Sequence, residues 1–377
     1  MLIKNSYLNI SKLAMILLLV GCNTKPTSIS IPQMETLEEF ETIIAVEDAT
    51  LATPNIIKYS GESTLFIYDA GQDKVMELGL DGNEKNNFGR TGRGPGEFQR
   101  INSMFFINDN LYIVDYLQYK INKYNRDGDI VSTTDYRLST VRPNTPPAPF
   151  SSTTILASNL DNQPLVTLEG DVLISSVNFS QNLSVQTVYE LRDWDMKFIT
   201  GIGEIPDGTS LIVDDEKMRS DISDQVVPAI AKATAFPVSD IANTDEYFLV
   251  YSAIPKIEKY NTTGEKLWES VITGIPENEK REAMYFENME KVLSSNPQSR
   301  TVLRYYRSGL SCANGDLYLI MGTNPLIVHQ FDENGSLSNR YQLVSEDIDL
   351  KPIFDIDCIN NKMFVVTEEA EIRAYTF

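Results

Sequence analysis

Few residues in this chain could carry out chemistry. Its 377 residues include one histidine, His329, and three cysteines, Cys22, Cys312 and Cys358. A metal site that needs two imidazoles is therefore excluded, and a histidine-based triad has a single candidate. His329 falls inside a strand-like run, where a lone histidine is expected to be structural or solvent-facing rather than catalytic. We therefore expect no catalytic residue and no protein metal site built on histidine.

The first cysteine belongs to a targeting segment. Lys4 and Lys12 precede an apolar run that is too short to span a bilayer, and the run ends in Leu-Val-Gly-Cys at Cys22. This ending resembles the bacterial lipobox, which implies removal of residues 1–21 as a signal peptide and diacylation of Cys22. The alternative is an ordinary signal peptide with an incidental cysteine. Residues 22–39 are polar and are expected to form a flexible tether from a lipid anchor to a folded body.

Arginines gather in one glycine-rich segment of an acidic chain. Residues 89–98 read Gly-Arg-Thr-Gly-Arg-Gly-Pro-Gly-Glu-Phe and contain Arg90 and Arg93, with Arg100 just beyond. The segment lacks the Lys-Ser/Thr of a P-loop, so its glycines are expected to serve a tight turn rather than a phosphate cradle. The three arginines could hold a carboxylate or a sulfate, or they could pair with neighbouring acids. Both interpretations stay open.

A second candidate site combines cations and aromatic rings. Arg304, Tyr305, Tyr306 and Arg307 follow one another directly. Two arginines and two tyrosines suit a platform for a glycan or a peptide, although alternate aromatic residues could equally belong to the core. We count all four as candidate ligand-binding residues.

The composition of the chain argues against a nucleic-acid-binding protein and is compatible with a large folded domain. Lys and Arg number 32 against 53 Asp and Glu, which gives a formal net charge of −21, and 42% of the residues are hydrophobic. A strongly acidic protein is not expected to bind nucleic acid, because that needs a basic face. The apolar content is enough for a large core.

The elements that must position these residues form an internal repeat. A unit of two strand-like runs between polar turns recurs six times, most clearly at 108–128. Such units predict a six-bladed β-propeller over residues 40–377, an all-β fold in which each blade is a four-stranded antiparallel sheet. An open β-solenoid or two β-sandwiches are the alternatives. The last copy lacks an outermost strand, which residues 41–47 could supply to close the ring.

Long insertions fall between blades. They comprise a Pro-rich stretch at 138–165, an amphipathic run near 213–233 and a helical segment at 277–294. Connections from an outermost strand to the next innermost strand all emerge on one face of a propeller, so the insertions and the glycine-rich segment are expected to share that face. Binding commonly resides in such loops, although they could also merely shield strand edges.

The other two cysteines occupy matching positions in successive repeats. Cys312 stands five residues before Leu317, and Cys358 stands five residues before Met363, the equivalent strand position of the next repeat. Residues related by a blade rotation should have Cα atoms farther apart than the roughly 7 Å that a disulfide tolerates. The sequence therefore predicts two free, buried thiols.

The strand order and the Gly-x-Gly-Pro-Gly-Glu-Phe segment at 92–98 resemble the six-bladed propeller lipoproteins of Bacteroidota, and more broadly NHL-repeat and TolB-like propellers. The resemblance implies a lipid-anchored envelope protein and leaves its activity open. Absence of acids directly after Cys22 favours an outer-membrane anchor with the body facing the periplasm.

Two functions compete on this basis. The first is a binding or scaffolding module that holds a glycan, a peptide or a partner protein and contacts the membrane only through its lipid. The second is a calcium-assisted hydrolase or lyase of the propeller lactonase type, with channel acids as ligands. The shortage of histidine favours the binding module, which needs no cofactor, and whether calcium binds in the channel is left open.

Overall fold

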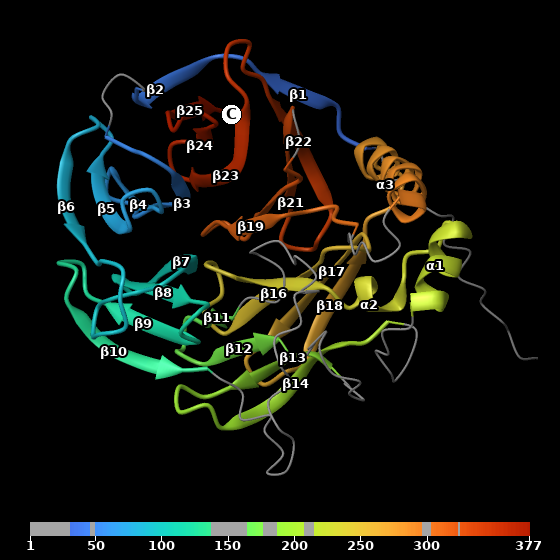
Figure 1. The fold of residues 1–377 in the computed structure, drawn as a ribbon, viewed down its shortest axis with the longest axis horizontal. Helices are drawn as coiled ribbons and strands as arrows, with labels where there is room; N and C mark the ends of the chain where they lie inside the picture. The colour runs from blue at the N-terminus through green and yellow to red at the C-terminus, as the bar shows by residue number, and fades with distance from the viewer. Residues whose placement is uncertain are drawn as a thin grey trace, which may run out of the picture. The chain divides into compact units, whose positions relative to one another are not determined.

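Each repeat of the sequence folds into one antiparallel sheet. The computed structural model describes residues 31–45, 50–136, 164–175, 187–206, 215–295, 303–322 and 325–377. Within the unit Pro32–Phe377, six sheets follow one another around a ring (Figure 1). The predicted six-bladed β-propeller is confirmed, and a solenoid or a pair of sandwiches is excluded.

The first three blades use four consecutive strands each, in order from the innermost to the outermost. Blade 1 comprises β3 (Pro54–Tyr59), β4 (Thr64–Asp69), β5 (Lys74–Gly79) and β6 (Glu84–Phe88). Blade 2 comprises β7 (Ile101–Ile107), β8 (Asn110–Asp115), β9 (Lys120–Tyr124) and β10 (Ile130–Asp135). Blade 3 comprises β11 (Leu165–Val166), β12 (Val172–Ser175), β13 (Thr187–Arg192) and β14 (Phe198–Glu204).

The other three blades follow the same order. Blade 4 comprises β15 (Ala235–Ser239), β16 (Glu246–Tyr251), β17 (Lys256–Asn261) and β18 (Lys266–Val271). Blade 5 comprises β19 (Ser308–Ser311), β20 (Leu317–Ile320), β21 (Leu326–Phe331) and β22 (Leu337–Leu343). Blade 6 comprises β23 (Leu350–Asp357), β24 (Lys362–Thr367), β25 (Ile372–Thr376) and β2 (Phe40–Ile44).

The core lies between the blades. Every residue of β4 is buried, whereas β6 at the rim is largely exposed. A central strand is covered on both faces by neighbouring blades, so its apolar residues run continuously, while an outermost strand keeps one wet face. Blades 1 and 2 share one such core, in which Phe66 and Tyr68 pack with Leu111 and Ile113.

Strand β2 closes the ring. It pairs antiparallel with β25, with Phe40 opposite Tyr375 and Thr42 opposite Arg373. Ile44 of β2 is buried with residues of blades 6 and 1. The prediction that residues 41–47 supply the missing outermost strand is therefore confirmed, with the strand itself ending at Ile44.

A further strand precedes the closure. β1 (Met34–Leu37) pairs parallel with β22, with Met34 opposite Arg340, and so adds a fifth strand to blade 5. The folded domain thus includes residues that were expected to belong to the tether. Four residues without strand-like alternation gave no signal, because their pairing depends on an edge that only the folded blade provides.

Three helices lie in the insertions that the structure describes: α1 (Asp215–Ser223), α2 (Ala229–Lys232) and α3 (Pro276–Ser295). The predicted helical segment 277–294 corresponds to α3, which begins with a proline and has Glu277 and Glu279 in its first turn, where the helix dipole favours acids. Almost all of the Pro-rich stretch 138–165 lies outside the described residues, as do residues 1–30. No helix among the residues that the structure describes is long and apolar enough to cross a membrane.

The prediction of two free thiols is wrong. Cys312 and Cys358 form a disulfide with a Cα–Cα distance of 5.9 Å. Each cysteine directly follows the innermost strand of its blade, β19 or β23. The distance between equivalent positions in neighbouring blades decreases toward the axis of the propeller. Because the innermost strands lie next to this axis, the two cysteines come close enough to bond.

We expect the disulfide to stabilise the ring. It closes a 46-residue separation, and the chain-entropy relation gives about 4 kcal/mol for a loop of that length. Urea unfolding of the Cys312→Ser, Cys358→Ser double variant should show a loss of a few kcal/mol, and reduction of the wild-type chain should produce a similar loss. Detection of two thiols besides Cys22 in unreduced, denatured protein would contradict the assignment.

Candidate functional site

A buried carboxylate holds the turn between β8 and β9 of blade 2. Asp115 is fully buried and accepts hydrogen bonds from the backbone N–H of Gln99 at 2.7 Å, the backbone N–H of Gln118 at 3.1 Å and the Gln118 side-chain amide at 2.7 Å. Because several N–H donors point at one carboxylate, the turn is tied to the segment before β7. The result is a rigid platform at the end of the blade.

Blade 1 uses the same scaffold. Asp69 accepts from the backbone N–H groups of Ala52 at 2.6 Å and Thr53 at 2.9 Å, and from the Gln72 side-chain amide at 3.0 Å. In both turns the residue after the glutamine is left-handed, with φ of 53° at Asp73 and 54° at Tyr119. The sequences are therefore two copies of Asp-x-x-Gln-x-Lys, at 69–74 and 115–120.

The two copies differ in what they present to solvent. Blade 1 carries Ala70, Gly71 and Asp73, whereas the matching residues of blade 2 are Tyr116, Leu117 and Tyr119. Tyr116 is 44% exposed and Leu117 is 52% exposed. A bulky residue in the left-handed region is rare and strained, and aspartate tolerates it better than tyrosine. Blade 2 thus displays the side chains of Tyr116 and Leu117, whereas the half-buried Tyr119 packs against Tyr136 and the neighbouring core.

The glycine-rich segment packs against this turn. The Gln118 side-chain amide donates to the carbonyl oxygen of Gly92 at 3.0 Å, and the Tyr116 N–H donates to the carbonyl oxygen of Arg100 at 3.0 Å. Within the segment the Glu97 carboxylate accepts from the Gly94 N–H at 2.7 Å. A Cβ on Gly89, which has φ of +83°, would overlap the ring of Phe98. These glycines serve the turn, as the sequence indicated.

The three arginines of this segment differ in their surroundings. Arg90 pairs with Glu97 at 2.7 Å, so the alternative of a neighbouring acid applies to it. The hydrogen bond that the Gly94 N–H donates to the Glu97 carboxylate is the largest cause that lowers the pKa of Glu97. The pairing with Arg90 lowers this pKa further. Arg93 and Arg100 are exposed beside the turn. We call Arg93, Arg100, Tyr116, Leu117 and Tyr119 the blade 2 platform.

Three members of the platform, its apolar and aromatic ones, were not among the residues predicted from sequence. Residues 116–119 look like a plain connection between two strands of the clearest repeat. The available signal was the comparison of the two Asp-x-x-Gln-x-Lys copies, which shows small residues at 70–71 replaced by large apolar ones at 116–117.

The second candidate group lies on blade 5, opposite blade 2 in the ring. Tyr305 and Tyr306 are only 2% and 1% exposed, so neither ring can act as a surface platform. The Tyr305 hydroxyl donates to Glu282 of α3 at 2.8 Å, and the hydroxyl of Tyr306 is hydrogen-bonded to His329 Nδ1 at 2.8 Å. Both rings instead join the core beneath α3. Arg304 and Arg307 are half-buried.

His329 is fully buried in β21. Burial first, and then the positive charges of Arg340 and Arg281, lower the pKa of His329 from 6.5 to about 3. The imidazole is therefore neutral at physiological pH, and its Nε2 lies 3.9 Å from Oε2 of Glu277.

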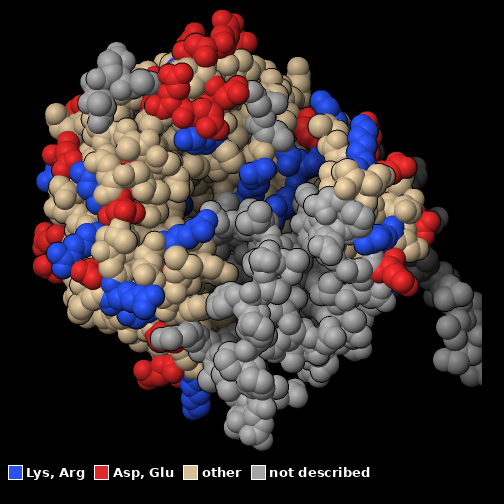
Figure 2. All heavy atoms as spheres, in the orientation of Figure 1, with Lys and Arg blue, Asp and Glu red and all other residues tan. Residues whose placement is uncertain are grey.

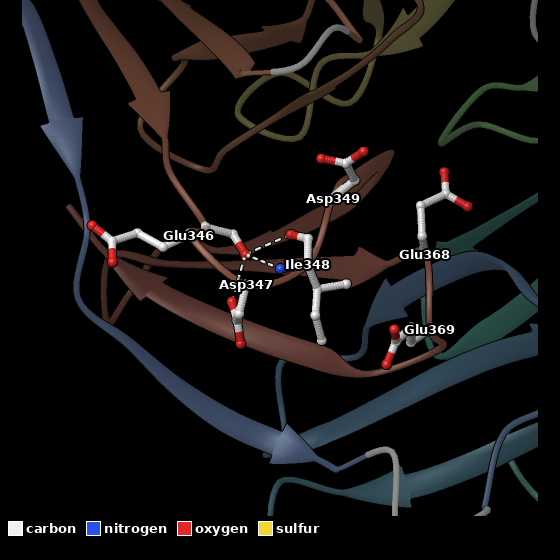
Figure 3. A pocket seen from close by; sticks show the side chains of 7 residues that line it. Glu346, Asp347, Ile348, Asp349, Glu368 and Glu369 are labelled. Atoms are coloured by element: carbon white, nitrogen blue, oxygen red, sulfur yellow. Dashed lines mark hydrogen bonds between the residues drawn. The ribbon is translucent and has the colours of Figure 1, made fainter.

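An acidic hollow of about 320 Å³ opens on blade 6 (Figure 3). Five carboxylates line it, those of Glu346, Asp347, Asp349, Glu368 and Glu369. They point in different directions, and Asp347 is held by Arg373 through two 2.8 Å hydrogen bonds, which are the largest cause of its lowered pKa. Among the described residues no group of three or more His, Cys, Asp or Glu side chains could hold a metal ion.

Charges are segregated on the molecule. In the view of Figure 2, acidic side chains crowd one part of the rim, whereas basic side chains gather over blade 5 beside the central hollow. Cations are scarce in this chain, and other basic side chains are scattered over the face visible in Figure 2.

Comparison with known proteins agrees with the fold. Residues 40–145, from β2 through blade 2, match a sequence family described as a 6-bladed beta-propeller. No curated protein matches the chain significantly. A Bacteroides fragilis protein described as exported shares 14% identity with a TM-score of 0.53, over 93% of this chain and 96% of that chain.

Two further solved structures are more distant. Virginiamycin B lyase from Staphylococcus aureus shares 14% identity with a TM-score of 0.44, over 90% of this chain and 99% of the lyase. The calcium-binding protein regucalcin from Agrobacterium tumefaciens shares 8% identity with a TM-score of 0.42, over 91% of this chain and 95% of regucalcin. Both TM-scores lie below 0.5, so neither structure supports a conclusion about this chain.

The buried histidine should make stability depend on pH. Below about pH 6.5 the unfolded chain binds a proton on His329 that the folded protein does not bind. The free energy of unfolding is therefore highest above this pH and falls as the pH drops toward about 3. Between pH 7 and pH 5 the free energy of unfolding should fall by about 2 kcal/mol from this group. Urea unfolding at several pH values should show a smaller loss of stability between pH 7 and pH 5 for His329→Gln than for the wild type. An equal loss in the two proteins would contradict the prediction.

Proposed function

We propose that this protein is a lipid-anchored binding module of the cell envelope, and that its blade 2 platform holds a peptide segment of a partner protein. The observation that carries the proposal is the difference between two copies of one turn. The same carboxylate-held scaffold bears Ala70 and Gly71 in blade 1, but the exposed side chains of Tyr116 and Leu117 in blade 2.

The chemistry of the platform indicates the kind of partner. Contiguous apolar patches on a protein surface mark interaction sites, and tyrosine and arginine are enriched where binding energy is concentrated. Arg93 and Arg100 stand beside the tyrosines on a chain whose net charge is −21. A partner segment with acidic groups and an apolar side chain would complement this platform. The hydrogen-bonded backbone of the blade 2 platform is rigid, so less conformational entropy is lost when a partner binds.

Other features favour an extracytoplasmic location. Disulfides such as Cys312–Cys358 persist in oxidising compartments. One protein of the same fold is described as exported. With a lipid on Cys22 and no acids directly after it, the proposal places the domain at the outer membrane, facing the periplasm. Acyl chains on one cysteine would then be the contact with the membrane.

A glycan on the platform and a calcium-assisted hydrolase or lyase are the competing functions. A sugar ring could stack on Tyr116, so acidic glycans form one arm of the binding test. The described residues offer no cluster of metal-ligating side chains, so no particular observation favours the calcium-dependent enzyme. Calcium titration of the full chain forms another arm.

A turn exchange should separate binding from folding. The double variant Tyr116→Ala, Leu117→Gly gives the exposed positions of the blade 2 turn the residues of blade 1 without touching Asp115, Gln118 or the half-buried Tyr119. We expect the melting temperature to stay nearly the same, because both side chains that are removed are exposed. Affinity for fluorescent acidic dodecapeptides containing Leu or Phe, measured by anisotropy, should fall at least tenfold.

Matched controls sharpen this test. Basic peptides of the same length should not bind, and added salt should weaken binding of the acidic ones. Arg93→Ala should reduce affinity, whereas Lys85→Ala in blade 1 should not. Equal affinity of the wild-type chain and the turn-exchange variant would refute the platform, and saturable binding of polygalacturonate alone would replace the peptide with a glycan.

The anchor has its own test. Cells that express the full chain and are fed radiolabelled palmitate should label it, and Cys22→Ala should abolish the label and release the protein from the membrane fraction. Equal labelling of the Cys22→Ala variant would exclude lipidation at this position. A Cys312→Ser variant serves as the control for nonspecific acylation.

A further inference from the structure

A cluster of polar side chains lies beneath the first two turns of α3. These residues come from the helix, from the segment before β19 and from strands β21 and β22 of blade 5. We call them the α3 polar cluster: Glu277, Asn278, Arg281, Tyr306, His329 and Arg340.

The cluster is held together by few direct contacts. Glu277 forms an ion pair with Arg340. Tyr306 is hydrogen-bonded to His329 at 2.8 Å, and the nearby Glu277 carboxylate favours the imidazole tautomer with its proton on Nε2. Arg281 donates to the carbonyl oxygen of Arg304 at 3.1 Å.

Several buried polar atoms of the cluster have no hydrogen-bond partner. They include Nε2 of His329 and Nε of Arg340, together with Oε2 of Glu277, while the Asn278 amide interacts with the Tyr306 side chain. Asn278 is 4% exposed, and His329 is fully buried. Burying a polar group without a partner is unfavourable, so several such groups around one place indicate a polar guest.

The charge of the cluster is positive. Arg281 and Arg340 are set against the single carboxylate of Glu277, and His329 is neutral. Burial, followed by repulsion from Arg307, lowers the pKa of Arg281 to about 10. An anion near Arg281 would relieve both effects.

The neighbouring backbone makes room for another guanidinium. A Cβ on Gly322, which has φ of +61°, would overlap Cδ of Arg307 and would lie 2.9 Å from Cβ of Pro352. A glycine at this position therefore lets the stem of Arg307 pass close to the chain and approach Arg281. Basic side chains are visible over blade 5 beside the central hollow in Figure 2.

We propose that the α3 polar cluster binds a single oxyanion group, a carboxylate, a sulfate or a phosphate. Arg281 is the main charge partner, and Asn278, His329 and Arg340 supply neutral and charged N–H donors. Water bound beside the anion satisfies the acceptor oxygens of Glu277 and Asn278. This site lies on blade 5, across the ring from the blade 2 platform, and it does not depend on the function proposed for that platform.

Calorimetric titration of the full chain with sodium acetate, sodium sulfate and sodium phosphate tests the site at constant ionic strength set with sodium chloride. One of these anions should show saturable binding with a stoichiometry of one, and comparison of acetate with the tetrahedral anions distinguishes a carboxylate from a sulfate or phosphate source. The turn-exchange variant of blade 2 should bind that anion with unchanged affinity.

Two variants locate the anion. Arg281→Gln and the isosteric Asn278→Asp, which adds a negative charge to the cluster, should each weaken binding at least tenfold. Lys280→Gln, at an exposed position of the same helix, should change it less than twofold. The proposal fails if none of the three anions binds saturably up to tens of millimolar, or if Asn278→Asp and Arg281→Gln bind as the wild type does. Asn278→Asp keeps the test decisive if Arg281→Gln does not fold.

Discussion

A sheet that is apolar on both faces is stable only between two other sheets, and this constraint governs the whole molecule. The central strands of each blade are buried on both sides, so every blade needs two neighbours. Six blades meet that need only as a closed ring, and β2 closes it by pairing with β25. Ile44 then completes the core between blades 6 and 1, and the disulfide links the innermost strands of blades 5 and 6.

Because the side chains of the central strands are buried between blades, the exposed connections are the parts of the chain that can contact a ligand. Blades 1 and 2 show how such a connection acquires a role without loss of its scaffold. Asp69 and Asp115 hold their turns through the same donors, so the intervening side chains are free to change. In blade 2 they have become Tyr116 and Leu117, which contribute nothing to the core.

Electrostatics divides the molecule into distinct regions. The carboxylates of the blade 6 hollow diverge, and one of them is neutralised by Arg373. Arg93 and Arg100 instead stand on the surface of blade 2, while Arg281 of α3 and Arg340 of β22 both lie near the buried His329. On a chain with a net charge of −21, such cationic places are where an anionic ligand is attracted most strongly.

Local sequence was enough to predict the number of blades, the order of strands, the closing role of residues 41–47 and the position of α3. All of these follow from periodicity and turn residues, which need no knowledge of distant contacts. Packing in three dimensions was needed to show that Cys312 meets Cys358, that Tyr305 and Tyr306 are buried under α3, and that β1 joins blade 5. The tertiary structure was also needed to show that Arg90 forms an ion pair with Glu97, and that Tyr116 and Leu117 are exposed to solvent. Those outcomes depend on how closely blades approach at the axis and which face each connection covers, and these distances are set by the closed ring rather than by any one repeat.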